Sequence, residues 1–157
     1  KLLFSNLDVV VLHTEEGDNH ETHGHDFVTA TRLFLADAAS GTYSQISPAM
    51  GVDDGNGSWS PDGEWIAFGR RHPRTDTGRQ LWLMRMDGSE SHALSDALRV
   101  NHGPPIWSPD GTTIAFQRFE MDDPQADPQI WLMDVVSAEM RPLVESGMLP
   151  AWLTPTP

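Results

Sequence analysis

A short histidine-rich segment could support metal chemistry. His20, His23 and His25 stand close together, and Asp26 follows directly. In an extended segment His23 and His25 point to the same side, so two imidazoles and a carboxylate could hold Zn²⁺, Ni²⁺ or a similar divalent ion. The alternative is a solvated polar insertion, because the spacing matches no dedicated zinc motif and the chain has no cysteine.

A cluster of arginines is the second candidate. The formal net charge is −13, yet four of the ten basic residues crowd between positions 70 and 79. Guanidinium groups there could bind an anionic group or an acidic partner through bidentate contacts. The alternative is internal pairing with the acidic segment next door, through Glu120, Asp122, Asp123 and Asp127. The candidate partner-binding residues are Arg70, Arg71, Arg74, Arg79, Glu120, Asp122 and Asp123.

Other chemical signals are weaker. The segment 53–57, Asp-Asp-Gly-Asn-Gly, loosely resembles a calcium loop but lacks the alternating ligands and the distal glutamate. The sequence contains no GxSxG, HExxH or phosphate-loop motif. Ser60 and Ser108 both precede a proline in a repeated phrase, which favours a role in turns over nucleophilic catalysis. We therefore expect no catalytic residue and no cofactor apart from the divalent ion considered above.

Composition excludes several classes of function. A strongly acidic surface argues against binding to nucleic acid or to anionic lipid. No apolar run approaches the roughly 20 residues of a membrane-spanning helix. The chain starts at Lys1 with no signal-peptide pattern, so we expect either that a leader was removed or that the sequence begins inside a longer protein. The chain has no cysteine, so cysteine usage does not indicate whether the protein works in an oxidising or a reducing compartment.

The candidate binding residues lie within a chain that contains a tandem repeat, so the fold of the repeat determines where they are placed. The phrase WSPDGEWIAF, which begins at Trp59, recurs as WSPDGTTIAF at Trp107. Downstream of each copy, LWLM at Leu81 recurs as IWLM at Ile130. Apolar runs of three to five residues between Gly, Pro, Asp and Ser clusters predict four short strands in each unit. In each Ser-Pro-Asp-Gly turn the proline presets φ and the glycine accepts positive φ, which predicts a bulged hairpin.

A fainter copy precedes these two, and a partial one follows them. LFLADAASG at position 33 aligns with the LWLM segment, and we align Phe4-Ser5 with Trp-Ser and Val9 to Leu12 with the IAF strand. The tail from Pro150 restarts the cycle with Trp152. Four strands in a period of 40 to 50 residues predict a β-propeller blade. A β-sandwich of about 12 strands is the alternative, although sandwiches do not usually repeat one turn at constant spacing.

The two full copies resemble a known family. PxWSPDGxxIAF followed by xIWLMD is similar to the TolB-like β-propeller repeat, which also occurs in propellers of prolyl oligopeptidase-family and tricorn-like proteases. The fold expected is all-β, with four-stranded antiparallel blades, about three of them present together with the first strand of a fourth. The expected blades are 2–50, 57–97 and 104–145, with the next one starting at 150–157.

The propeller model separates core positions from exposed loops. Trp59, Trp82, Trp107, Trp131 and Trp152 recur at equivalent positions, so we expect them between blades, whereas Trp65 has no counterpart and should be partly exposed. Short turns should share one face and long connections the other. The long, charged segments predicted on that second face, where His72 and His102 are also expected, are 14–28, 48–57, 70–79 and 118–129.

The function expected is a non-catalytic scaffold that binds a protein or peptide partner through these loops. The resemblance implies a periplasmic or otherwise extracytoplasmic location. Two alternatives stay open: the gating propeller of a larger serine peptidase, and a metal-dependent propeller enzyme that acts on carbohydrate. Because propellers close with about four to eight blades, three units predict self-association or membership of a larger ring.

Overall fold

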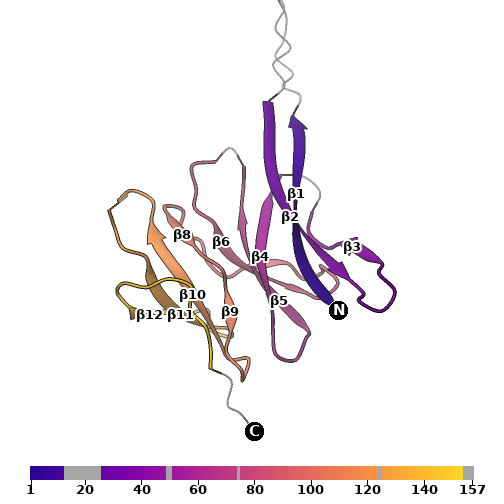
Figure 1. The fold of residues 1–157 in the computed structure, drawn as a ribbon. Helices are drawn as coiled ribbons and strands as arrows, with labels where there is room; N and C mark the ends of the chain where they lie inside the picture. Colours follow the sequence, from indigo (N-terminus) through magenta and orange to yellow (C-terminus); the bar gives the residue numbers. More distant parts are fainter. Residues whose placement is uncertain (13–25, 49–50, 74, 124, 154–157) are drawn as a thin grey trace, which may run out of the picture.

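The protein is an all-β molecule built from three antiparallel sheets that lie side by side (Figure 1). The computed structural model describes residues 1–12, 26–48, 51–73, 75–123 and 125–153, with 8–12 and 26–28 described as backbone alone. Each sheet corresponds to one blade of a partial β-propeller, as the repeat predicts. Among the described residues there is no helix that could span a membrane.

The second sheet has the four strands of a complete blade. Its strands β4 (Asp53–Trp59), β5 (Trp65–Arg71), β6 (Gln80–Arg85) and β7 (His92–Ala93) pair in chain order. Ile66 and Phe68 pack with Leu33 of the first sheet. Ala67, between them, faces the other way and packs with residues of the third sheet. The IAF run is apolar throughout because it is buried between two neighbouring blades.

The third sheet has an inner strand in two parts. β8 (Val100–His102) and β9 (Ile106–Trp107) both pair with β10 (Thr113–Glu120), which is followed by β11 (Gln129–Asp134) and β12 (Met140–Val144). Pro104 and Pro105 separate the two parts, and proline offers no N–H to a ladder. The β4–β5 ladder is irregular at the matching place, between Gly55 and Ser58.

The first sheet corrects our alignment of the first unit. It has three strands, β1 (Leu2–Leu12), β2 (Asp26–Ala36) and β3 (Tyr43–Gln45). Phe4 pairs with Phe34 in the register in which Phe68 pairs with Trp82. β1 is therefore the counterpart of β5, so Phe4-Ser5 does not occupy the Trp-Ser position and Val9 to Leu12 only extends the same strand. The local likeness of Phe-Ser to Trp-Ser was misleading because pairing, rather than residue type, decides the position.

The repeated turn has the predicted geometry. The Ser60 hydroxyl donates to Asp62 Oδ1 at 2.5 Å and accepts a hydrogen bond from the backbone N–H of Trp65 at 2.9 Å. Gly63 has a φ of 76°. Ser108, Asp110 and Gly111 repeat the arrangement. Both serine hydroxyls are thus engaged within their turns.

Two indole groups bind the backbone of inner strands: Trp107 connects the third blade to the second, whereas Trp152 lies in residues 151–153, which form no strand, contrary to the fourth-blade strand expected from position 150. Trp107 Nε1 donates to the carbonyl oxygen of Ser58 at 3.1 Å, and Trp152 Nε1 donates to that of Ile106 at 3.3 Å. Trp107 is buried between blades as expected, but Trp152 is 37% exposed and is not a core residue. Trp65 is half-buried, with the Arg85 guanidinium 4.1 Å from its ring centroid.

The connections leave the sheets on two sides, as predicted. Apart from residues 74 and 124, which lie outside the described residues, the connections 72–79 from β5 to β6 and 121–128 from β10 to β11 lie at the upper side of Figure 1. The short turn from β4 to β5 lies at the lower side. We call the upper side, defined by residues 72–79 and 121–128, the loop face.

Candidate partner-binding site

The segment 53–57 is part of strand β4 and is buried at residues 53–55, which corrects its assignment to a charged linker on the loop face. Asp54 is fully buried and accepts two hydrogen bonds from Arg70, from Nε and from Nη2, each at 2.7 Å. The Arg70 guanidinium also lies 4.3 Å from the ring centroid of Trp82. Because Asp54 is neutralised by a buried arginine, the calcium-loop interpretation is also excluded.

Asp53 accepts hydrogen bonds from the first blade and from its own blade. Thr31 of the first blade donates its backbone N–H and its hydroxyl to Oδ1, at 2.9 and 2.6 Å. Arg71 and Arg79 donate to Oδ2 at 2.7 and 2.9 Å. Burial of Asp53 raises its pKa, but the Thr31 hydrogen bonds and then the arginine charges outweigh it and lower the pKa to about 2. Asp53 is therefore held as a carboxylate.

The arginine cluster is paired internally, but with other carboxylates than we expected. Arg70, Arg71 and Arg79 bind Asp53 and Asp54 of their own blade. The acidic segment of the third blade was the expected partner, because its charge is conspicuous in the sequence. Arg74 and the three histidines His20, His23 and His25 lie outside the described residues, and Asp26 is described as backbone alone. Among the residues whose positions are described, no group of three or more metal-ligating side chains is found.

The acidic residues of the third blade lie on the loop face, where Arg99 fixes one of them. The Arg99 guanidinium pairs with Asp122 of the loop 121–128 and with Asp76 of the loop 72–79. Hydrogen bonds with Asp122 first, and with Asp76 second, raise the pKa of Arg99 above its usual value. One cation therefore connects the long loops of two blades.

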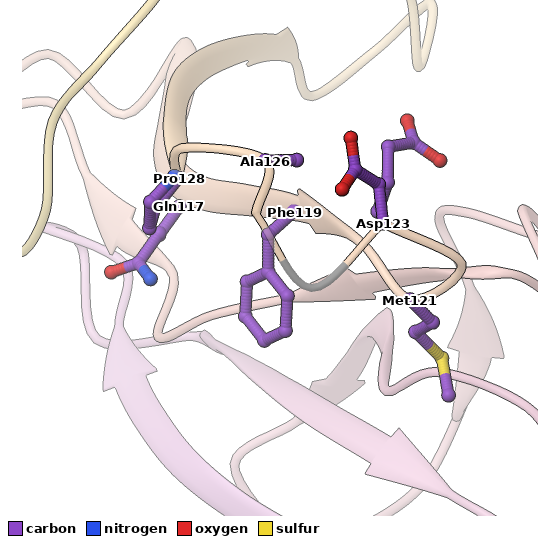
Figure 2. Close-up of a pocket in the computed structure, with 7 residues that line it drawn as sticks. Gln117, Phe119, Met121, Asp123, Ala126 and Pro128 are labelled. Atoms are coloured by element: carbon purple, nitrogen blue, oxygen red, sulfur yellow. The ribbon is translucent and has the colours of Figure 1, made fainter.

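A hollow opens beside this bridge, between the end of β10 and the loop that follows it (Figure 2). Its volume is about 460 Å³. In Figure 2 the ring of Phe119 lies between Gln117 and Pro128 on one side and Met121 on the other, and Asp123 stands at the rim. The residues that line the hollow are Gln117, Phe119, Glu120, Met121, Asp123, Ala126 and Pro128.

The rim of the hollow is acidic and its wall is apolar. Glu120 is exposed and is held by Arg118 at 3.3 Å. Asp123 Oδ1 accepts the backbone N–H of Gln125 at 2.9 Å, which closes a local turn. Asp123 Oδ2 and the side-chain amide of Gln117 have no hydrogen-bond partner among the described residues. The sequence identified Glu120 and Asp123 as binding candidates, but gave no indication of the apolar wall beside them.

A buried polar network near the interface of the second and third blades was not expected from the sequence. His102 lies in β8 and is 1% exposed, which corrects its assignment to a loop; His72 does lie in a loop and is exposed. The Ser95 hydroxyl lies 3.1 Å from His102 Nδ1 and donates to Gln80 Oε1 at 2.9 Å. Burial first, and the charge of Arg118 second, lower the pKa of His102 to about 4. This serine–histidine pair is enclosed, so we assign it to packing.

Solved structures show what this chain resembles. The putative TolB of Agrobacterium tumefaciens matches with a TM-score of 0.62 and 26% identity over 72% of this chain and 40% of its own. An oligogalacturonate lyase in complex with manganese matches with a TM-score of 0.55 and 23% identity, over 73% of this chain and 30% of the lyase. A prolyl endopeptidase matches with a TM-score of 0.54 and 17% identity, over 74% of this chain and 19% of the endopeptidase. No family model and no curated protein sequence matches the chain.

These likenesses concern the fold. The chain resembles TolB-like propellers, as the repeated phrase indicated, and it shares its blade architecture with propellers of a lyase and a peptidase. It spans less than half the length of each of these three proteins. Their sites and activities are therefore considered for this chain only as proposals.

Proposed function

We propose that this chain is a non-catalytic scaffold that binds a protein or peptide partner on its loop face. The observation that carries the proposal is the Arg99 bridge to Asp76 and Asp122, beside the open hollow of the third blade. Loops that present charge in a fixed arrangement lose less conformational entropy on binding than free loops do. The resemblance to TolB supports an extracytoplasmic location.

The two alternative functions both connect the propeller with an enzyme. The likeness to a prolyl endopeptidase supports a gating propeller, and the likeness to a manganese-bound lyase supports an enzyme acting on carbohydrate. In this chain the serines of the repeated turn donate to Asp62 and Asp110, and the Ser95–His102 pair is enclosed. These contacts favour a structural use of the serine hydroxyls over a nucleophilic one.

The test is a binding screen with defined ligands and a chemical readout. The purified chain is incubated with an array of synthetic peptides. The bound peptides are eluted, and their masses are measured by mass spectrometry. Binding of a subset of intact peptides, weakened by Arg99→Gln but not by Arg85→Gln, is the expected result. Arg85 also bridges two exposed carboxylates, Glu64 and Glu90, but away from the long loops, so it is the matched control.

Three results would contradict the proposal. Shortened peptides would indicate hydrolysis, and unsaturated products from oligogalacturonate with manganese would indicate lyase activity. Equal loss of binding in Arg85→Gln and Arg99→Gln would show that only overall charge matters. In that last case the loop face would have no special role.

A further inference from the structure

The first blade has no inner strand among the described residues. In the second blade the inner strand β4 pairs with β5, and in the third blade β8 and β9 pair with β10. β1 is the counterpart of β5 and β10, but it lies at the edge of its sheet, with β2 on one side and no described strand on the other. The backbone N–H and C=O groups along this edge are therefore open to a further strand.

One indole N–H marks the same open position. Trp107 Nε1 donates to the carbonyl oxygen of Ser58, and Trp152 Nε1 donates to that of Ile106. Each indole thus binds the residue that comes just before the tryptophan of the preceding unit. Trp59 is the first tryptophan of this series, and its Nε1 has no hydrogen-bond partner in the described part of the chain. The carbonyl oxygen that would continue the series belongs to the inner strand that the first blade lacks.

The segment 147–153 has the complementary property. The backbone N–H of Gly147 donates to the carbonyl oxygen of Pro128 at 2.7 Å, as that of His102 donates to Arg79 at 2.9 Å one unit earlier. Each acceptor stands directly before its strand, β11 or β6. Together with the second indole bond, this contact places the segment at the inner-strand position that follows the third blade. The segment itself forms no strand, because no described strand lies beside it to pair with.

An apolar face of the first blade is also uncovered. Phe4 stacks on Phe34, with the ring centroids 5.3 Å apart. The register that matches Phe4 to Phe68 matches Leu2 to Ile66. Ile66 and Phe68 are completely buried because the first blade packs on them, whereas Leu2 is 58% exposed. A further blade on this side would bury Leu2 and the aromatic pair in the same way.

We propose that the segment 147–153 of a second copy of this chain adds to the open edge of β1 and becomes the inner strand of the first blade. The exchange is reciprocal, so two copies of three blades close one ring, within the usual range of about four to eight blades. The registers of the second and third blades place Ala151 of the partner subunit opposite Leu3. Trp59 then donates to the carbonyl oxygen of Ala151 of the partner subunit, so every tryptophan of the series has an acceptor.

Two observations identify a second copy as the occupant of this edge. The segment is held against the third blade and does not reach β1 of its own chain, since the second sheet lies between the first and the third (Figure 1). Three exposed apolar residues, Met148, Leu149 and Leu153, lie along the segment, and the aromatic face beside β1 offers them an apolar surface. This interface lies away from the loop face, so the inference goes beyond the proposed function.

The first test is an engineered disulfide, since the chain has no cysteine of its own. Directly opposed residues on antiparallel strands have Cα atoms about 4.5 to 5.5 Å apart, a distance that a disulfide can span. The double variant Leu3→Cys with Ala151→Cys should form a covalent dimer on mild oxidation, seen on a denaturing gel. Neither single variant should form it, because each new cysteine lies opposite the other position. A double variant that forms no more dimer than the single variants overturns the proposal.

The second test is the indole of Trp59. Sedimentation should give the wild type a mass twice that of one chain, 17.4 kDa. Trp59→Phe removes one hydrogen bond of roughly 1 kcal/mol from each of two interfaces, so the Kd of the dimer should rise about 25-fold, about five-fold for each bond. Trp65→Phe is the matched control: it makes the same change in a half-buried tryptophan beside Arg85 and should leave the Kd unchanged.

Nuclear magnetic resonance locates the contact directly. The indole N–H signal of Trp59 in ¹⁵N-labelled protein, identified by its loss in Trp59→Phe, should move downfield as the protein concentration rises and the dimer forms. The signal of Trp107 should stay in place, because its acceptor belongs to its own chain. A Trp59 signal that does not depend on concentration overturns the proposal.

The remaining outcomes are equally decisive. A monomer at every concentration, or equal changes of the Kd in Trp59→Phe and Trp65→Phe, overturns the strand exchange. Sedimentation of the wild type needs no substitution, so it tests the proposal even if the cysteine variants fail to fold. A dimer without the disulfide and without the indole shift associates through another surface, which also overturns the proposal. The peptide screen concerns the loop face, so its failure would overturn the proposed function alone.

Discussion

Residue contacts on the inner strand of the second blade determine much of its stability. Asp54→Asn leaves the Arg70 guanidinium buried without a counter-charge, since the two side chains are 0% and 7% exposed. We expect the free energy of unfolding, measured with urea at pH 7, to fall by about 3 kcal/mol. Glu64→Gln breaks an exposed pair with Arg85 and should have little effect. Similar losses in both variants would contradict the importance of burial.

Asp53 predicts a dependence of stability on pH. Its pKa is about 2 in the fold against an ordinary 3.8, so its carboxylate stabilises the fold above pH 4 and this contribution disappears as the pH falls towards 2. The difference in unfolding free energy between the wild type and Asp53→Asn should be largest above pH 4 and shrink towards pH 2. His102, with a pKa of about 4, contributes mainly above this window. A difference that stays constant from pH 2 to 6 would rule out this role.

At the scale of elements, the Ser-Pro-Asp-Gly hairpin is an independent test of backbone geometry. Gly63 has a positive φ, and a Cβ there would meet nothing within 4 Å, so substitution affects only the backbone. Gly63→Ala should cost about 1 kcal/mol in thermal or urea unfolding, and Gly63→Asn should cost less, because asparagine tolerates this region better. If the alanine and asparagine variants are equally stable, the left-handed conformation is not what this turn requires.

The elements differ in how far the sequence could predict them. The strands around IAF and LWLM and the turn at Gly63 follow from local composition, and the structure confirms them. Strand β4 begins with Asp-Asp-Gly-Asn-Gly, which has the composition of a loop. It is a strand because arginines 16 to 26 residues away neutralise its two carboxylates. Sequence periodicity contains no information about such distant pairing, and for the same reason β1 was aligned with the wrong strand.

The hollow was missed for a different reason. Its lining includes Pro128 and Gln117, which stand where the second blade has Arg79 and Gly69. A comparison of the two copies position by position would have shown these differences. The sequence drew attention to the acidic residues instead, of which Glu120 and Asp123 do line the hollow while Asp122 is engaged by Arg99.

At the scale of the whole molecule, the outer face of the third blade predicts association. Leu143, Val144, Met148 and Leu149 are 43 to 73% exposed at and after β12. An apolar strip of this kind favours a partner surface, and two copies of three blades would fall within the usual range of about four to eight blades. We expect sedimentation to give a mass above that of one chain, 17.4 kDa, and Met148→Glu with Leu149→Glu to reduce it. A compact monomer would contradict this prediction.

The indole hydrogen bonds to the inner strands have a consequence for how the blades unfold. Trp107 of the third blade donates to the carbonyl oxygen of Ser58 in the second blade, and Trp152, which follows the third blade, donates to that of Ile106 in the third. In repeat proteins such nearest-neighbour terms decide whether units unfold separately or together. Amide hydrogen exchange in the second and third blades should then report one shared opening event, and Trp107→Phe should split it into two.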